Sequence, residues 1–159
     1  MRTRWMVVAG LVALLGSGCV AHPSVPVESD ERIANELRSL RGTGRTRPLK
    51  DVVPGDWDAV HILSGPMSRR LVERTVGVPV DMDEVFLEDA DLLLLMRGGA
   101  VVRVVSTGFH ALNNGRYSTS AQLVTAQDPN NVGIGVVDPN SPPSSSAPRS
   151  SPRQAPATS

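Results

Sequence analysis

Ser64, His61 and Asp58, all in the segment WDAVHILS, are the residues whose types come closest to those of a hydrolase. Side chains alternate along a strand, so Asp58 and Ser64 share one face while His61 lies on the other. A second histidine, His110, belongs to a separate segment. A serine nucleophile needs a histidine base within hydrogen-bond reach, oriented by a carboxylate. The local spacing cannot assemble this arrangement, and we therefore predict that the chain is not an enzyme.

The densest group of ionisable residues is the acidic stretch VDMDEVFLEDAD, residues 80–91. Its start at Asp81 looks like a calcium-binding loop, which needs glycine at its sixth position and glutamate at its twelfth. Phe86 and Leu92 occupy those two positions instead. We therefore predict a solvated connection whose charges discourage pairing with other chains. No metal and no cofactor are expected.

The charges of the chain balance, with 16 basic and 16 acidic residues. Removal of Arg2 and Arg4 would leave 14 basic residues against 16 acidic ones, a net charge near −2. Only 3% of the residues are aromatic, so stacking side chains are few. These features argue against a nucleic-acid partner. The basic run from Arg38 to Lys50 has two interpretations. One is contact with anionic headgroups or wall polymers, and the other, which we favour, is a solvated helix end followed by a loop.

Cys19, the only cysteine, follows an uncharged run that extends from Trp5 to Gly18. Arg2 and Arg4 precede the run, and a positive start, a short apolar run and small residues together form a secretory signal. The run is shorter than the roughly 20 apolar residues of a membrane-spanning helix. A single thiol excludes an internal disulfide and a metal site built from several cysteines.

The residues that end at Cys19 resemble the lipobox of bacterial lipoproteins, in which an apolar residue and two small residues precede the cysteine. Gly16 takes the position of the preferred apolar residue, which lies one place earlier at Leu15. The resemblance implies a diacylglyceryl group on Cys19, and two acyl chains hold a protein firmly on a membrane. Two alternatives remain open: cleavage after Ala21, which would release a soluble secreted protein, and an uncleaved N-terminal anchor.

Two segments are predicted to be helices, because apolar residues recur on one face of each. SDERIANELRSLR has Ser29 as its N-cap and Gly42 as its stop, and RRLVERTV lies between the N-cap Ser68 and Gly77. The apolar faces comprise Ile33, Leu37 and Leu40 in the first helix and Met67, Leu71, Val72 and Val76 in the second.

The other apolar runs predict strands. WDAVHILS is one of them, and Leu92–Met96 and Val101–Val105 form a hairpin around a Gly-Gly turn. Asn114-Gly115 predicts a further turn, and residues 132–137 predict a last edge strand. The fold class is therefore α+β: a small, mainly antiparallel sheet with two helices, the second of which crosses one face of the sheet.

Composition divides the chain into four parts. We predict a lipoprotein signal peptide at residues 1–18, a tether at 19–28 and a small α+β domain at 29–138. The Ser- and Pro-rich tail, residues 139–159, has no apolar periodicity and is predicted to be disordered.

One stretch of the domain, residues 57–106, carries a resemblance to a known group of proteins. A Trp57-Asp58 strand runs into Gly65-Pro66, then into a short Ser-capped helix ending at Gly77, and the hairpin LLLLMRGGAVVRVV follows. This order resembles a family of small exported bacterial proteins, many of them lipoproteins of unknown function. Met67 stands where that family usually has an aromatic residue. The resemblance implies the fold and an envelope location and brings no activity with it.

The functional expectation is a protein held on the outer face of a bacterial membrane by a lipid on Cys19, with a non-enzymatic binding or accessory role. Its expected partners are the membrane and an envelope protein or wall component. The alternatives are an exported hydrolase whose His/carboxylate site is assembled by the fold, and the soluble secreted form. A polar pocket that holds His61 or His110 beside a carboxylate would favour the hydrolase, whereas an apolar surface patch would favour binding.

Overall fold

The computed structural model describes residues 25–128 and 133–140. The predicted signal peptide, Cys19 and the tail from residue 141 onward lie outside the described residues. Within the described ranges, no helix is long and apolar enough to cross a membrane.

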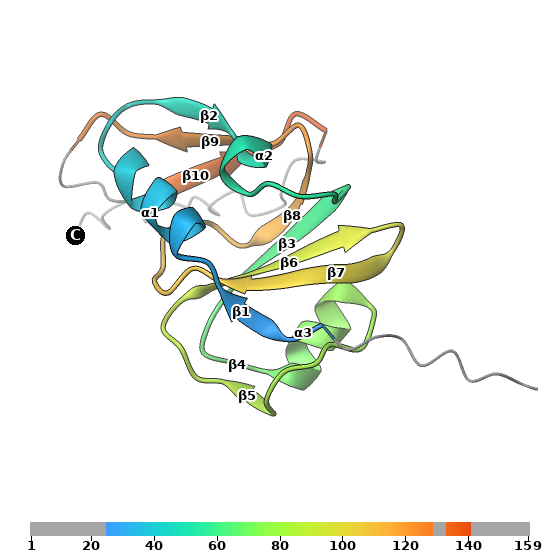
Figure 1. Cartoon of the computed structure of the whole chain (residues 1–159). Helices are drawn as coiled ribbons and strands as arrows, with labels where there is room; N and C mark the ends of the chain where they lie inside the picture. The colour runs from blue at the N-terminus through green and yellow to red at the C-terminus, as the bar shows by residue number, and fades with distance from the viewer. Residues whose placement is uncertain (1–24, 129–132, 141–159) are drawn as a thin grey trace, which may run out of the picture.

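A five-stranded sheet forms the middle of the domain (Figure 1). Its strand order is β1-β7-β6-β3-β8, and every neighbouring pair is antiparallel except β1 with β7. The strands are β1 (Val27–Ser29), β3 (Ala59–Ser64), β6 (Asp91–Arg97), β7 (Ala100–Ser106) and β8 (Gly115–Ser118). The predicted α+β class and the mainly antiparallel pairing are confirmed.

The central strand β6 is buried on both faces, which explains its continuous apolar run LLLLM. Leu93 and Leu95 belong to the core on one side of the sheet, and Leu92 and Leu94 belong to the core on the other side. The turn between β6 and β7 is at Gly98-Gly99, where both residues have positive φ, 56° and 84°. Glycine adopts this conformation without strain, so the predicted hairpin is confirmed.

One face of the sheet is covered by a second sheet and two helices (Figure 1). The second sheet has the order β10-β9-β2. Its strands are β2 (Thr46–Pro48), β9 (Gln122–Thr125) and β10 (Ile134–Val137), and the helices are α1 (Glu31–Leu40) and α2 (Leu49–Val52). Ile33, Leu37 and Leu49 from the helices are fully buried in this core.

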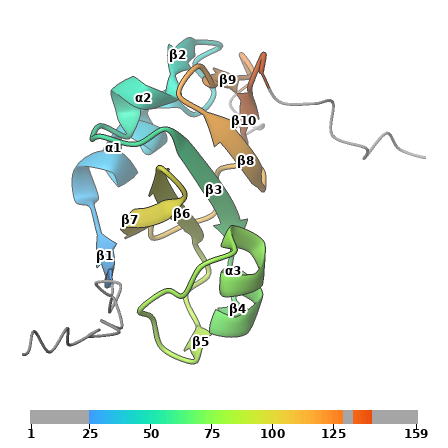
Figure 2. The same ribbon diagram turned by 90° about the vertical axis from the view of Figure 1, so that its right-hand side faces the viewer.

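The opposite face is covered by α3 (Arg69–Val76) and by the short pair β4 (Met67–Ser68) and β5 (Val85–Phe86), as Figure 2 shows. The second predicted helix thus lies on one side of the sheet, where Val72 is its buried residue. Gly65 leads into this layer, and a Cβ there would lie 2.5 Å from the carbonyl oxygen of Glu88. The close approach of the two backbones requires glycine at this position.

The helix boundaries agree with the prediction at α3 and differ at α1. Ser68 caps α3 by accepting a hydrogen bond from the backbone of Leu71, and Gly77 ends it in the left-handed conformation. Leu71 itself is 49% exposed, contrary to the predicted apolar face. The N-cap of α1 is Asp30, whose carboxylate accepts from the backbone N–H of Ile33 at 3.1 Å. The predicted cap, Ser29, is instead the last residue of β1.

Three further features differ from the predictions. The four-residue helix α2 was not predicted, so the domain has a third helix. Val27 and Glu28, assigned to the tether, belong to β1, which pairs with β7 far along the chain. Asn114-Gly115 does not join two strands, because β8 begins at Gly115 and residues 107–114 contain no strand. In each case the structure follows a tertiary contact that local periodicity does not reveal.

Candidate functional site

Ser64, Asp91 and His110 meet where the last residue of β3 lies opposite the first residue of β6. Ser64 Oγ donates a hydrogen bond to Asp91 Oδ1 at 2.9 Å. His110 Nδ1 lies 2.9 Å from the same oxygen. Asp91 is fully buried, although it ends the acidic stretch that was predicted to be solvated. For this residue that prediction is wrong.

The second oxygen of Asp91 holds the loop that follows β7. Oδ2 accepts hydrogen bonds from the backbone N–H groups of Ala111, at 2.8 Å, and Leu112, at 2.7 Å. The backbone of Asp91 also pairs with Thr107 and Phe109 in the same loop. Both oxygens therefore accept two hydrogen bonds each, as a buried carboxylate requires. The arrangement identifies Asp91 as the residue that joins the edge of the sheet to residues 107–112.

The order of the three side chains differs from that of a catalytic triad. A triad places histidine between serine and the carboxylate, so that histidine can take the serine proton. Here the carboxylate of Asp91 lies between Ser64 and His110. The other neighbours do not complete a triad either. Ser64 Oγ is 2.8 Å from Asn114 Oδ1, and His110 Nε2 is 2.7 Å from Asp89 Oδ1. Ser64 therefore has no base in this geometry.

The two carboxylates also favour the protonated form of His110. The hydrogen bond to Asp91 raises the pKa of His110 above its usual value. Desolvation lowers the pKa, but the hydrogen bonds and the charges of Asp91 and Asp89 together outweigh that effect. A histidine with a raised pKa is a weaker candidate for a general base near neutral pH. In this geometry the imidazole of His110 lies between two carboxylates, both of which favour its charged form.

His61 and Asp58 are not part of this cluster. His61 is paired in register with Leu94 and Arg116, and its pKa is lowered, first by burial and then by the charge of Arg116. Asp58 Oδ2 accepts a hydrogen bond from the backbone N–H of Gly98 at 2.7 Å, which fastens the β6–β7 turn. The fold thus brings together Ser64 and His110 but not the remaining hydrolase candidates.

The basic run from Arg38 to Lys50 is engaged within the domain. The guanidinium groups of Arg38 and Arg41 lie over the ring of Phe109, 4.8 and 4.6 Å from its centre. Arg41 also donates to the backbone carbonyl of His110 at 2.6 Å. These contacts hold the loop beside Asp91 against α1, which the prediction of a solvated helix end did not include.

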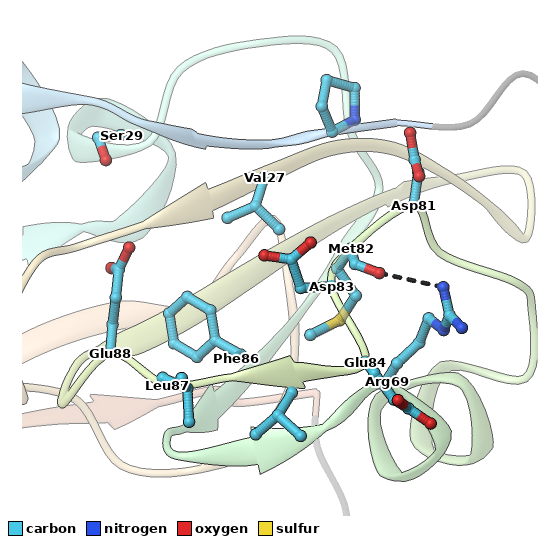
Figure 3. Close-up of a pocket in the computed structure, with 12 residues that line it drawn as sticks. Val27, Ser29, Arg69, Asp81, Met82, Asp83, Glu84, Phe86, Leu87 and Glu88 are labelled. Atoms are coloured by element: carbon cyan, nitrogen blue, oxygen red, sulfur yellow. Dashed lines mark hydrogen bonds between the residues drawn. The ribbon is translucent and has the colours of Figure 1, made fainter.

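A groove of about 770 Å³ lies between β1 and the acidic stretch (Figure 3). One wall comes from Pro26, Val27 and Ser29, and the other comes from residues 81–88 together with Arg69. The carboxylates of Asp81, Asp83 and Glu84 are exposed, and they take part in no hydrogen bond or ion pair with other described residues. In those parts of the chain no group of three or more His, Cys, Asp or Glu side chains is placed to hold a metal ion.

Two features that define this region were not predicted from the sequence. Asp91 resembled its acidic neighbours, and the only signal that set it apart was its position directly before the buried run LLLL. The groove depends on β1, which was predicted to be part of the tether. No protein-family model, curated protein or solved structure matches this chain. The fold class and the geometry of these residues are therefore the basis for a functional proposal.

Proposed function

We propose that this protein is exported, carries a lipid on Cys19 that holds it on the outer face of a bacterial membrane, and serves there as a binding module without catalytic activity. The observation that carries the binding role is the groove between β1 and residues 81–88. Three of its four carboxylates, those of Asp81, Asp83 and Glu84, have no partner among the described residues, while Glu88 accepts a hydrogen bond from Ser106 Oγ. The carboxylate of Asp91, by contrast, is satisfied by its neighbours. The partner is an envelope protein or a wall component.

The position of the predicted anchor agrees with this role. Cys19 is six residue steps before Val25, and a chain of that length reaches at most about 20 Å. The groove is lined by Pro26 and Val27, which follow directly. A lipid on Cys19 would therefore keep the groove close to the membrane surface. Segments of other membrane-anchored envelope proteins are accessible at that surface.

Intact-mass analysis and membrane fractionation of the full chain, expressed in a bacterium that processes lipoproteins, test the anchor. The wild-type protein is expected in the membrane fraction, with a mass that corresponds to a chain starting at Cys19 plus a diacylglyceryl group. Cys19→Ser should lose this mass increment, whereas the matched substitution Ser24→Ala should keep it. A soluble wild-type chain that starts at His22, or a membrane-bound chain without lipid, contradicts the proposal.

The hydrolase alternative has one observation in its favour, which is the placement of His110 beside two carboxylates. It requires Ser64 to become nucleophilic, although the acceptors beside its hydroxyl are Asp91 Oδ1 and Asn114 Oδ1 and not a histidine. Labelling with a fluorophosphonate probe separates the alternatives. We expect no labelling of the wild-type chain, and labelling that disappears in Ser64→Ala would establish the hydrolase instead.

A further inference from the structure

We propose that the groove between β1 and residues 81–88 binds an extended, positively charged peptide segment of a partner protein, which adds as a new strand to the outer edge of β1. This inference rests on the proposed binding role of the domain and is independent of the anchor at Cys19. It combines a sheet edge, a groove and a charge pattern at one place on the molecule.

The sheet edge is provided by β1. In the five-stranded sheet β1 pairs with β7 on one side, and within the described part of the chain no strand lies on its other side. Val27 is half-buried, while Glu28 and Ser29 are exposed. An edge strand presents backbone N–H and C=O groups that a further strand can pair with. Val27 and Ser29 of this strand line the groove (Figure 3), so a peptide in the groove lies directly beside β1.

The opposite wall determines the charge of the partner. Four carboxylates line the groove, and Arg69 is the single cation among its lining residues. The guanidinium of Arg69 donates to the backbone carbonyl of Met82 at 3.2 Å, so it is already bound to this wall. Figure 3 shows Asp83 pointing across the groove toward Val27, with Asp81 beside the start of the same strand. Charge complementarity therefore selects a peptide rich in lysine or arginine and repels an acidic one.

Apolar side chains on the same wall define the second feature of the partner. Leu87 is 80% exposed and Val85 is 43% exposed, and both line the groove. Side chains of an extended peptide alternate between two directions. A segment in which basic residues alternate with aliphatic ones can thus present its charges to the carboxylates and its apolar groups to Leu87, while its backbone pairs with β1.

The binding experiment uses the full-length chain in detergent and three fluorescein-labelled heptapeptides, measured by fluorescence anisotropy at low salt. The first peptide has the sequence KVKVKVK, the second has glutamate in place of lysine, and the third is the basic peptide with alternate backbone nitrogens methylated. N-methylation removes backbone donors without changing the charge, so it separates strand addition from simple charge attraction. The acidic and N-methylated peptides are each expected to bind at least tenfold more weakly than the basic one.

Two double variants locate the site. Asp81→Asn with Asp83→Asn is expected to weaken binding of the basic peptide about tenfold. The matched pair Asp51→Asn with Asp56→Asn removes the same charge from exposed positions outside the groove lining and should change binding less than twofold. Both variants should keep the wild-type melting temperature. Hydrogen exchange of the β1 amides should slow when the basic peptide is bound.

Three results would overturn the inference: equal binding of basic and acidic peptides, equal binding of the N-methylated peptide, or unchanged exchange in β1. Displacement of the peptide by millimolar calcium at constant ionic strength would also overturn it, by identifying a cation site instead. None of these results bears on the lipid at Cys19, which the mass analysis tests separately. A chain that binds none of the peptides while carrying the lipid contradicts strand addition and leaves the anchor standing.

Discussion

Replacement of Asp91 by alanine tests the central role of this carboxylate. The side chain is fully buried and accepts two backbone N–H bonds through Oδ2, from Ala111 and Leu112, both of which are buried. Alanine cannot accept these bonds, and the small space left behind does not provide partners for them. Each buried donor without a partner costs about 1–3 kcal/mol. We therefore expect Asp91→Ala to lower the free energy of unfolding by roughly 2–6 kcal/mol, before any loss from His110 is counted.

Asparagine at the same position provides a graded comparison. Its carbonyl oxygen can still accept from Ala111 and Leu112, and its NH₂ group can donate to Ser64 Oγ. The NH₂ group repels protonated His110, so Asp91→Asn should be destabilised by less than the alanine variant but should fall below the wild type. Its effect should diminish at a pH where His110 is neutral.

Urea denaturation followed by circular dichroism measures both variants, with the linear extrapolation used only if the slope is unchanged. Asp89→Ala is the matched control, because Asp89 also contacts His110 but its side chain is 89% exposed. Exposed ion pairs contribute little to stability, so this variant should unfold almost as the wild type does. An alanine variant at position 91 within about 1 kcal/mol of the wild type would refute the argument, since that is less than one unsatisfied buried donor costs.

Three further predictions concern other parts of the domain. The pKa of His110 is raised in the folded protein, so its stabilising effect is fully present below the usual value of 6.5 and is lost as the pH rises through the raised pKa. The difference in urea midpoint between the wild type and His110→Gln should therefore shrink with increasing pH. A difference that grows would contradict the ion-pair assignment. Asp58→Ala removes the acceptor of the Gly98 N–H and should cost about 1 kcal/mol, with faster hydrogen exchange at the turn; unchanged exchange there would count against it. Leu94→Ala, at a fully buried position, should lower the free energy of unfolding by about 2–5 kcal/mol in urea. Leu87→Ala, at a position 80% exposed, should lower it far less. Equal losses would show that the buried layer is misassigned.

Much of the fold was predictable because its determinants are local. The β6–β7 hairpin follows from two apolar runs joined by Gly98-Gly99, and both glycines adopt the positive φ that such turns require. The helix α3 follows from Ser68 and Gly77, whose capping roles depend only on residues within one turn. The boundary of α1 was misplaced by one residue, because Ser29 and Asp30 are both good caps and only pairing with β7 assigns Ser29 to a strand.

The candidate site was less predictable, because its members come from distant segments. Ser64 and His110 were identified as chemically capable residues, but their common partner Asp91 was grouped with a solvated stretch. Its burial depends on the pairing of β3 with β6 and on the return of residues 107–112 to the same end of the sheet. No local pattern of polar and apolar residues encodes such a contact. The same is true of the groove, whose two walls come from segments at least 40 residues apart in the chain.

The sequence by itself determined the α+β class, the central hairpin and the short helix on one side of the sheet, and it carries the prediction of a lipid on Cys19. These features depend on residues close together in the chain, where spacing and turn chemistry act directly. Only the tertiary structure decided that Val27–Ser29 form an edge strand, that Asp91 is buried between Ser64 and His110, and that a groove lined by four carboxylates runs beside β1. The physical reason is that each of these features forms only when folding brings distant segments of the chain into contact. The free energies of these contacts depend on burial and hydrogen bonding that exist only in the folded domain.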